Sequence, residues 1–587
     1  MLWCQAAGRN VSRAGTSGRP NHGRPKCRVT IAFWKLASVT AGCIVFAVAI
    51  RMPSCGESFW LDELHSAWVI WNGPSEIAQR AQIGNQNPTY FWGLWGWRQL
   101  FGDSERVLRA SSVFAVAISI AIVTRHFGRT GKGVLGMLVA GAVLAVERQS
   151  LFYGTELRPY AWLLPLSALM VTTSMDPTQS VARRLTVWTL TGVAAMHLQP
   201  TSLPVWLGGM VVILIREPRT VWFHRTTVTC LVAFALSAFP IVASVATTTW
   251  ALRQRWAAFA KPDEVADLWQ MWPTIWVGVV PAGMLAITWF GWSRTCSAEI
   301  ESDRFGLPHR IQRVRLASAW LFAAVAITTA VFSLAWTDLL TLWHPRYLLS
   351  LLPILAVVTG HAIDTWGDVE GRSSGLRRVT ALSLASLVVI GLVGEQRTWV
   401  PLSRGQTVLV VRGEDWRAAA AGLRRRVIQA TTTPIAKSTD ETMSSPEAAS
   451  TSLTTALGDV PPVFVDSGLV EAAFYRQRFL EAGTPLPTAV KEYLTFPFRG
   501  PYEIGGAELV PMMQRGSSAG TSDGPNHRAG LEEHYLVYRV PVHRIELRRR
   551  GGGSGIARAF GFGNLTVISV PGSHHESSKP PGALRGR

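Results

Sequence analysis

The sequence predicts an α-helical integral membrane protein with about eleven transmembrane helices and a small C-terminal α/β domain outside the cytoplasm. Composition is the first reason, because 48% of the 587 residues are hydrophobic and only 16% are charged, whereas soluble domains carry about 25% charged residues. The 25 tryptophans are the second reason, since indole rings favour the membrane–water interface. The third is a series of apolar runs, each near the ~20 residues that cross a bilayer.

These apolar runs occupy the first two-thirds of the chain. Residues 1–28 hold six basic residues and no acid, which is typical of a cytoplasmic tail ahead of a signal anchor. Residues 29–395 then form the predicted transmembrane domain. Its expected spans lie near 29–50, 107–126, 133–147, 159–174, 185–198, 201–215, 227–248, 271–291, 316–336, 345–363 and 377–394.

Basic residues set the predicted orientation of these spans. The formal charge is +19, from 57 basic minus 38 acidic residues, and it is scattered between apolar segments, so we expect no nucleic-acid partner. Cytoplasmic loops are rich in Lys and Arg, and loops at alternate ends of the spans follow that rule. They carry Arg125, Arg129, Lys132, Arg183, Arg184, Arg216, Arg219, Arg225, Arg294, Arg304, Arg310, Arg313, Arg315, Arg372, Arg377 and Arg378. The loop at 249–270 is an exception, but eleven spans still place the chain after residue 395 outside the cytoplasm.

Residues 396–570 are expected to form the extracytoplasmic domain. Strands are predicted at 407–411, 462–468, 534–540 and 565–570, with helical stretches at 418–430 and 471–480. Alternation of strands with helices indicates an α/β unit. The Ser/Thr/Pro-rich insert 431–456 and the tail 571–587 are expected to be disordered.

The loop at 51–106 is the longest connection between predicted spans. Its stretch PTYFWGLWGWRQLFG, residues 88–102, is aromatic and too short to span, which indicates a helix lying in the membrane interface. The stretch FWLDELHSAW then places Asp62 and Glu63 close to the outer membrane surface. A structural alternative is a pair of solvated acids, or an N-cap at Asp62 for a short helix.

Two arginines are predicted at the same surface. Pro159 in YGTELRPYAW and Pro345 in WHPRYLLSLLP suit the first turns of two spans, which places Arg158, with Glu156 beside it, and Arg346 at their outer ends. An arginine at a helix N-terminus opposes the helix dipole unless an anion satisfies both. The pattern therefore indicates a phosphate or pyrophosphate site. The alternative for each arginine is a side chain that reaches lipid headgroups.

Taken together, these motifs resemble a known family. The run from FWLDELHSAW through NQNPTYFWGLWGWRQLFGDSERVLRASSVFA to YGTELRPYAWLLPLSALM is similar to polytopic GT-C glycosyltransferases. The likeness is to the family 39 group, which includes protein O-mannosyltransferases and the lipid A aminoarabinose transferase. It covers roughly residues 29–175 and extends more loosely through HPRYLL to about residue 395.

The resemblance implies a hexosyl- or pentosyltransferase of the inner or plasma membrane. Its donor would be a sugar on a polyprenyl phosphate, and its acceptor a hydroxyl of a protein, lipid or polysaccharide. Asp62 would be the general base of a direct, inverting attack, with Glu63 as its neighbour or alternate. The donor phosphate would be held by Arg158 and Arg346, and other parts of the substrates by Glu156, Tyr160 and Tyr347.

The resemblance has one departure and implies no metal. Many relatives carry a His-Pro-Pro type sequence before the interfacial helix, where this chain reads GNQNPTYF. Asn87 and Pro88 keep the turn, but the histidine is missing. The acids cluster only as Asp62 with Glu63, with His65 three residues beyond Asp62, and the six cysteines form no CxxC pair. We therefore expect no metal and no cofactor.

Two other functions fit the same composition. A transporter or flippase of lipid-linked sugars would also need external arginines for phosphate. Such proteins commonly contain internal repeats and polar groups near the membrane midplane, and the sequence shows no repeat. A homologue that binds lipid without catalysis is the second alternative.

Overall fold

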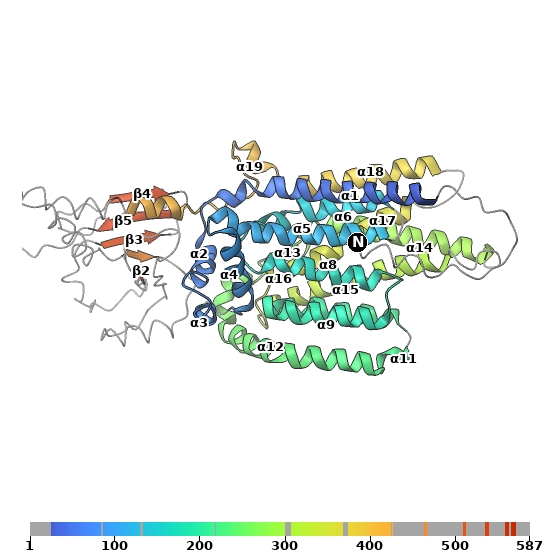
Figure 1. Ribbon diagram of the computed structural model, residues 1–587, viewed down its shortest axis with the longest axis horizontal. Coiled ribbons are helices and arrows are strands. Elements are labelled where there is room, and N and C mark those ends of the chain that lie inside the picture. The colour runs from blue at the N-terminus through green and yellow to red at the C-terminus, as the bar shows by residue number, and fades with distance from the viewer. Residues whose placement is uncertain are drawn as a thin grey trace, which may run out of the picture.

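A computed structural model describes residues 25–83, 86–129, 133–217, 219–299, 307–367, 374–423 and 425, and five strands further along the chain. Most of these residues are helical (Figure 1). The helices are α1 (Pro25–Arg51), η1 (Ser54–Gly56), α2 (Leu61–Val69), α3 (Ile77–Ile83), α4 (Thr89–Phe101), α5 (Glu105–Arg129), α6 (Val134–Val146), α7 (Arg148–Tyr153), α8 (Tyr160–Met175), α9 (Val181–Leu198), η2 (Pro200–Ser202), α10 (Leu203–Arg216), α11 (Arg219–Trp222), α12 (Arg225–Ala260), α13 (Ala266–Gln270), η3 (Ile275–Val279), α14 (Val280–Glu299), α15 (Leu307–Trp336), α16 (Pro345–Leu348), η4 (Leu349–Leu351), α17 (Leu352–Gly367), α18 (Ser374–Glu395) and α19 (Val400–Ser403).

Each of the eleven segments predicted to span the membrane is helical in the structure. Within the described residues, five helices are long and apolar enough to cross a membrane, judged by length and composition. They cover Leu36–Gly56, Glu105–Arg129, Arg225–Thr247, Ile311–Trp336 and Pro345–Trp366. Five further apolar helices are shorter, at Val134–Val146, Tyr160–Met175, Pro200–Arg216, Ile275–Phe290 and Val379–Glu395. The number of crossings therefore stays a prediction, whereas the predicted helical bundle is confirmed.

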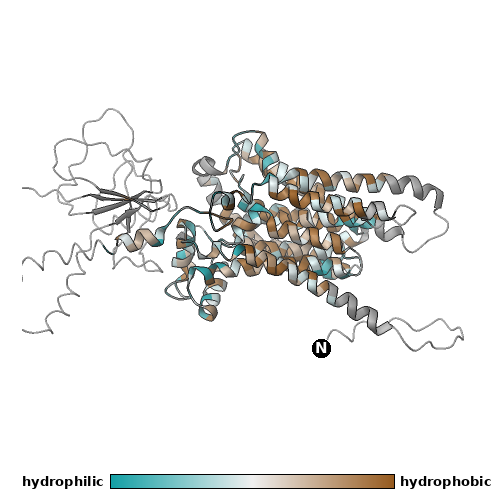
Figure 2. Ribbon diagram, turned by 90° about the horizontal axis from the view of Figure 1, so that it is seen from above, coloured by the Kyte–Doolittle hydropathy of each residue, from teal (hydrophilic) through white to brown (hydrophobic). Residues whose placement is uncertain are grey.

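The bundle is built around α17, which packs against α6, α8, α14, α15 and α18. Its contact with α6 is a close approach of two backbones. A Cβ atom added to Gly136 would lie 2.4 Å from the carbonyl oxygen of Gly360, so only glycine fits there without displacing the helices. Hydrophobic residues run along the whole bundle, as Figure 2 shows in brown. Because α17 continues η4 and α16, this packing fixes the segment that carries Arg346.

A cap of short helices covers one end of the bundle. Figure 1 shows α2, α3 and α4 at the end nearest the sheet, with α11 at the opposite end. These three helices share a second hydrophobic cluster that includes Phe59, Leu61 and Phe91. The predicted interfacial helix at 88–102 is thus a helix, α4, and Asn87 accepts hydrogen bonds from the backbone N–H (3.0 Å) and the hydroxyl (2.7 Å) of Thr89 at its start.

The described part of the C-terminal region contains a mixed sheet of five strands. The strands are β1 (Val463–Val465), β2 (Leu509–Pro511), β3 (His534–Tyr538), β4 (Arg558–Phe562) and β5 (Leu565–Val570), in the order β2-β1-β3-β5-β4. β1 runs parallel to β2 and β3, whereas β5 runs antiparallel to β3 and β4. The strands predicted near 462–468, 534–540 and 565–570 are confirmed in part or whole. The expected helix 471–480, the insert 431–456 and the tail 571–587 lie outside the described residues.

The strand predicted at 407–411 is wrong. These residues are irregular, and their alternating pattern has another cause, because Val408 and Val410 are buried without joining the sheet. The helix expected at 418–430 begins earlier, at Trp416, and is described to Leu423 and again at Arg425. The chain between α19 and this helix instead lies against α2.

Candidate active site

Helix α2 presents Asp62 from its first turn. The helix begins at Leu61, after Trp60 in an extended conformation, so Asp62 is not the N-cap that the sequence allowed. Its side chain forms an ion pair with Arg158. An acid in the first turn is still favoured by the helix dipole.

Asp62 lies between the two predicted arginines. Its Oδ2 atom is 3.0 Å from Nη2 of Arg158 and 3.9 Å from Nη1 of Arg346. The three residues come from α2, from the loop before α8 and from α16, so the fold joins parts of the chain that are far apart in sequence. Asp62 is 8% exposed and Arg158 is 3% exposed. Two guanidinium groups against one carboxylate leave a net positive charge in a site with little water.

Both arginines lie beside helix starts, as the prolines predicted. Pro159 is the residue immediately before α8, and Pro345 is the first residue of α16, which leads through η4 into α17. A helix N-terminus carries a partial positive charge, which adds to that of an adjacent guanidinium. The arrangement therefore favours an anion at this place.

Glu63 is adjacent to Asp62 in sequence, but its side chain lies in a different environment from that of Asp62. Its carboxylate is fully buried and accepts two hydrogen bonds from Arg109, one from Nε at 2.8 Å and one from Nη2. It also accepts from the backbone N–H of Leu157 at 2.8 Å and of Trp60 at 3.3 Å. Burial alone would raise the pKa of Glu63, but Arg109 and Arg412 outweigh it and lower the pKa. These contacts tie α2 to α5 and to the loop before α8, which is a structural role.

Glu156 lies deep in the same region and differs from Glu63 in its partners. Its side chain is 1% exposed, and its Oε2 atom has no hydrogen-bond partner among the described residues. Its backbone carbonyl accepts a hydrogen bond of 2.5 Å from Ser112. Burial raises the pKa of Glu156 to about 8, against the opposite effect of Arg158. Burial therefore favours the protonated form of Glu156, which is able to donate a hydrogen bond.

The two predicted tyrosines flank Arg346. The Tyr347 hydroxyl accepts a hydrogen bond of 3.0 Å from Nη2 of Arg346, whose guanidinium also lies 4.9 Å from the centre of the Tyr347 ring. Tyr160, the first residue of α8, is buried and packs edge-on against Tyr153 with ring centres 5.5 Å apart. Tyr153 in turn lies 3.5 Å from Nδ1 of His344. Aromatic rings thus enclose the arginine.

His65 does not extend the acidic pair into a metal site. The ring is buried against Trp68 and Phe91, and burial lowers its pKa to about 3. Among the described residues, no group of three or more His, Cys, Asp or Glu side chains could hold a metal ion. The sequence-based expectation of no metal stays a prediction.

Sequence reasoning missed three residues that hold the site together: Arg109, Arg412 and Glu414. Arg109 carried a usable signal, because a charge within a predicted span marks a functional or structural partner. Glu414 carried a weaker one, since it belongs to the GEDWR stretch, residues 413–417, that follows the last span, and Arg412 directly precedes that stretch. The Nε atom of Arg412 is 3.7 Å from Glu63, and the carboxylate of Glu414 accepts from the backbone N–H of Leu61 at 3.0 Å.

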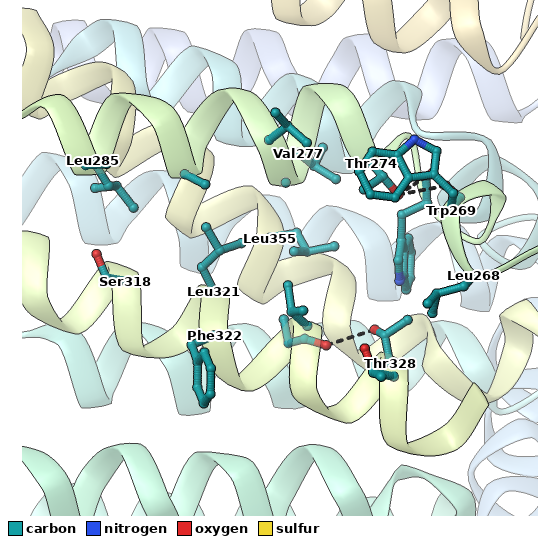
Figure 3. Close-up of a pocket in the computed structure, with 18 of the residues that line it drawn as sticks. Leu268, Trp269, Thr274, Val277, Leu285, Ser318, Leu321, Phe322, Thr328 and Leu355 are labelled. Atoms are coloured by element: carbon teal, nitrogen blue, oxygen red, sulfur yellow. Dashed lines mark hydrogen bonds between the residues drawn. The ribbon is translucent and has the colours of Figure 1, made fainter. Parts of the chain in front are cut away.

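An apolar cavity of about 830 Å³, partly open to the surface, lies between helices of the bundle. Figure 3 shows it between α14, which contributes Leu285, and α15, which contributes Leu321 and Phe322, with Leu355 of α17 on the third side. Trp269 lies at the end near α13. Leu355 is nine residues beyond Arg346, and the α-helical rise of 1.5 Å per residue places it about 14 Å along the same segment.

The sequence matches no family model and no curated protein. Comparison with solved structures finds similarity to the crystal structure of ArnT from Cupriavidus metallidurans in the apo state, with 14% identity over 92% of this chain and 98% of that chain and a TM-score of 0.45. A structure of the same protein bound to undecaprenyl phosphate gives 14% identity, 93% and 98% coverage, and a TM-score of 0.44.

A cryo-EM structure of the arabinofuranosyltransferase AftD from Mycobacteria is also similar, with 14% identity and a TM-score of 0.40. It matches 92% of this chain but only 40% of AftD. Because these TM-scores are below 0.5, the assignment of function rests on the geometry of the site.

Replacing Arg109 tests whether the Glu63 pair holds the site together. Arg109→Ala leaves the fully buried carboxylate of Glu63 without its main partner. We expect the free energy of unfolding to fall by about 3–5 kcal/mol. Lys261→Ala is the matched control, because it breaks an exposed pair with Asp338 and costs about 0–1 kcal/mol. Thermal and chemical unfolding of the detergent-solubilised protein measures both. Equal effects would contradict the assignment.

The raised pKa of Glu156 predicts a pH-dependent stability. An unfolded glutamate loses its proton near pH 4.5, but the folded one keeps it until about pH 8. The unfolded state is therefore favoured progressively as pH rises through this interval, and the effect levels off above it. Glu156→Gln removes the ionisation, so we expect its unfolding temperature to fall less than that of the wild type between pH 4.5 and pH 8. If the unfolding temperatures of the wild type and Glu156→Gln changed with pH by the same amount, this prediction would be contradicted.

Proposed function

We propose that this chain is a membrane glycosyltransferase that moves a sugar from a polyprenyl-phosphate donor to a hydroxyl acceptor. One observation carries the proposal. A carboxylate, Asp62, lies between two arginines, and within the described part of the chain the buried Nε and Nη1 atoms of Arg158 have no hydrogen-bond partner. Buried donors of this kind are costly unless a ligand satisfies them.

A donor phosphate satisfies these groups. Its oxygens accept from Nε and Nη1 of Arg158 and meet the charge of Arg346, and charge-assisted hydrogen bonds to phosphate are among the strong ones. A phosphate linked to a sugar and a lipid carries one negative charge, which balances the single net positive charge of Asp62 with two arginines. As the sugar–oxygen bond breaks, charge grows on the phosphate, and fixed cations stabilise it most at that stage.

Asp62 then takes the proton of the acceptor hydroxyl. In the structure its Oδ2 atom is engaged by Arg158, and a bound phosphate gives both arginines a second anion, which frees the carboxylate to act as a base. Direct attack of the acceptor on C1 inverts the configuration there. Glu63 is not a second base in this scheme, because Arg109 and the Leu157 backbone occupy its oxygens.

Glu156 and the tyrosines serve the remaining parts of the substrates. A neutral Glu156 offers a hydrogen-bond donor as well as acceptors to a sugar hydroxyl, without adding negative charge beside the phosphate. The hydroxyl of Tyr347 holds the guanidinium of Arg346 in place through a hydrogen bond. Tyr160 is buried and lines the same region. These roles depend on the proposed position of the donor phosphate.

The apolar cavity suits the polyprenyl chain of the donor. Its walls are Trp, Phe and Leu side chains of α13, α14, α15 and α17 (Figure 3). One of them, Leu355 of α17, lies about 14 Å beyond Arg346 along the same segment, by the helical rise. A hydrocarbon chain there is held by van der Waals packing, which drives association between apolar surfaces inside a bilayer, while the phosphate stays at the arginines. The basic-loop pattern of the sequence places this end of the bundle at the outer face, so we propose that the reaction takes place there, with the C-terminal domain on the extracytoplasmic side.

Asp62→Asn tests the function directly. It keeps the shape of the side chain but removes the base, and we expect transfer from a polyprenyl-phosphate sugar to fall by about 100- to 10,000-fold, the range for general-base catalysis. The assay follows transfer from a labelled donor pool in membranes that contain equal amounts of inserted protein. Asp103→Asn, in an exposed acid of the same external region, is the control and keeps its activity.

Undiminished transfer by Asp62→Asn would contradict the proposal. Movement of labelled lipid across the membrane without formation of a glycoside would favour the flippase alternative instead. Mass spectrometry of the glycans lost in a deletion strain identifies the sugar and the acceptor.

A further inference from the structure

We infer that residues Arg412–Arg417, here called the bracing segment, position the helix that carries Asp62 and so connect the C-terminal region to the active site. The inference rests on the proposed function, and it extends that function to a part of the chain outside the transmembrane domain. Three sets of contacts carry it.

Glu414 caps helix α2 from a distance of 353 residues in sequence. The residue before α2 is Trp60, whose side chain makes no capping hydrogen bond, so the first turn lacks the usual Ser, Thr, Asp or Asn acceptor. Glu414 supplies it, since its Oε2 atom accepts from the backbone N–H of Leu61 at 3.0 Å. A carboxylate at a helix N-terminus also interacts favourably with the dipole. The capped residue is next to Asp62.

The Glu414 side chain is itself held in place. Its Oε2 atom accepts a second hydrogen bond of 2.7 Å from the indole N–H of Trp416. Trp416 is 3% exposed and belongs to the same hydrophobic cluster as Phe59 and Leu61. The cap is therefore part of a packed interface rather than a loose surface contact.

Arg417 holds the chain immediately before α2. Its backbone N–H donates to the Ser58 hydroxyl at 3.0 Å, and its guanidinium donates to the Gly56 carbonyl at 3.0 Å. The same guanidinium pairs with Glu105 at the start of α5. The path from the end of α1 to Asp62 is thus fixed by the bracing segment on one side and by Arg109 on the other.

Arg412 contacts the segment that leads to Arg158, which is the second part of the chain that forms the site. Its Nη2 atom donates to the Phe152 carbonyl at 3.2 Å and to the Thr155 hydroxyl at 3.1 Å. Thr155 directly precedes Glu156, and Phe152 lies one helical turn earlier in the chain. The Nε atom of the same guanidinium lies 3.7 Å from Glu63. Arg412 therefore connects helix α2, which carries Asp62, to the loop before α8, which carries Arg158. The bracing segment therefore sets the distance between Asp62 and Arg158.

This role predicts a particular kinetic signature for Glu414→Ala. Arg158 and Arg346 stand on other segments, so donor binding and KM change little, whereas misplacement of Asp62 lowers kcat. We expect kcat per folded molecule to fall about 10-fold, because a displacement of about 1 Å between reacting groups can cost about 100-fold in rate and a lost cap moves Asp62 by less than that. Glu414→Gln keeps an acceptor oxygen and restores most of that loss.

The experiment uses the full chain in detergent or membranes. It measures kcat and KM of the wild type, Glu414→Ala, Glu414→Gln and Glu264→Ala, where Glu264 is an exposed glutamate between α12 and α13. Hydrogen–deuterium exchange of peptides that cover α2 is recorded on the same samples. The inference predicts faster exchange in the first turn of α2 for Glu414→Ala and no change for Glu264→Ala.

The outcomes separate this inference from the proposed function. Unchanged exchange at α2 in Glu414→Ala overturns the bracing role whether or not the protein transfers sugar. Faster exchange with an unchanged kcat also overturns it, because the contact then only stabilises the fold. Asp62→Asn, run in the same assay, reports on the proposed function alone.

Discussion

The site depends on the buried ion pair between Glu63 and Arg109. Consecutive residues on an α-helix point about 100° apart, so anchoring Glu63 against α5 directs Asp62 to the other side, toward Arg158 and Arg346. The two adjacent carboxylates thus have separate tasks. One is fully paired inside the protein, and the other, the proposed base, lies among surplus positive charge.

Much of this arrangement could be predicted from sequence because it depends on local patterns. Apolar runs and basic loops indicated the helices, and Pro159 and Pro345 indicated the helix starts that bring Arg158 and Arg346 to one end of the bundle. Asp62 was recognised because it lies in an external aromatic stretch. The structure confirms that these residues meet, whereas their roles in transfer are a proposal.

The remaining features depend on tertiary contacts that no local pattern encodes. The sequence motif named Asp62 as the base and Glu63 as its neighbour or alternate, and only the position of Arg109 on α5 shows that the two carboxylates lie in different environments. The prediction of a strand at 407–411 was wrong for a related reason. An alternating apolar pattern indicates that every second side chain is buried, but it does not show which part of the protein covers those side chains. Glu414 acts on a helix 353 residues away, and that pairing is fixed by the whole fold.

The central claim, that Arg158 and Arg346 bind a lipid phosphate beside Asp62, is tested most directly by equilibrium binding of a polyprenyl phosphate to the detergent-solubilised protein. A hydrogen bond to a charged group contributes about 1.5–3 kcal/mol, so Arg158→Gln and Arg346→Gln should each raise Kd by about 10- to 100-fold. Arg404→Gln, at an exposed arginine, should leave Kd unchanged. Wild-type affinity in both site variants would contradict the account.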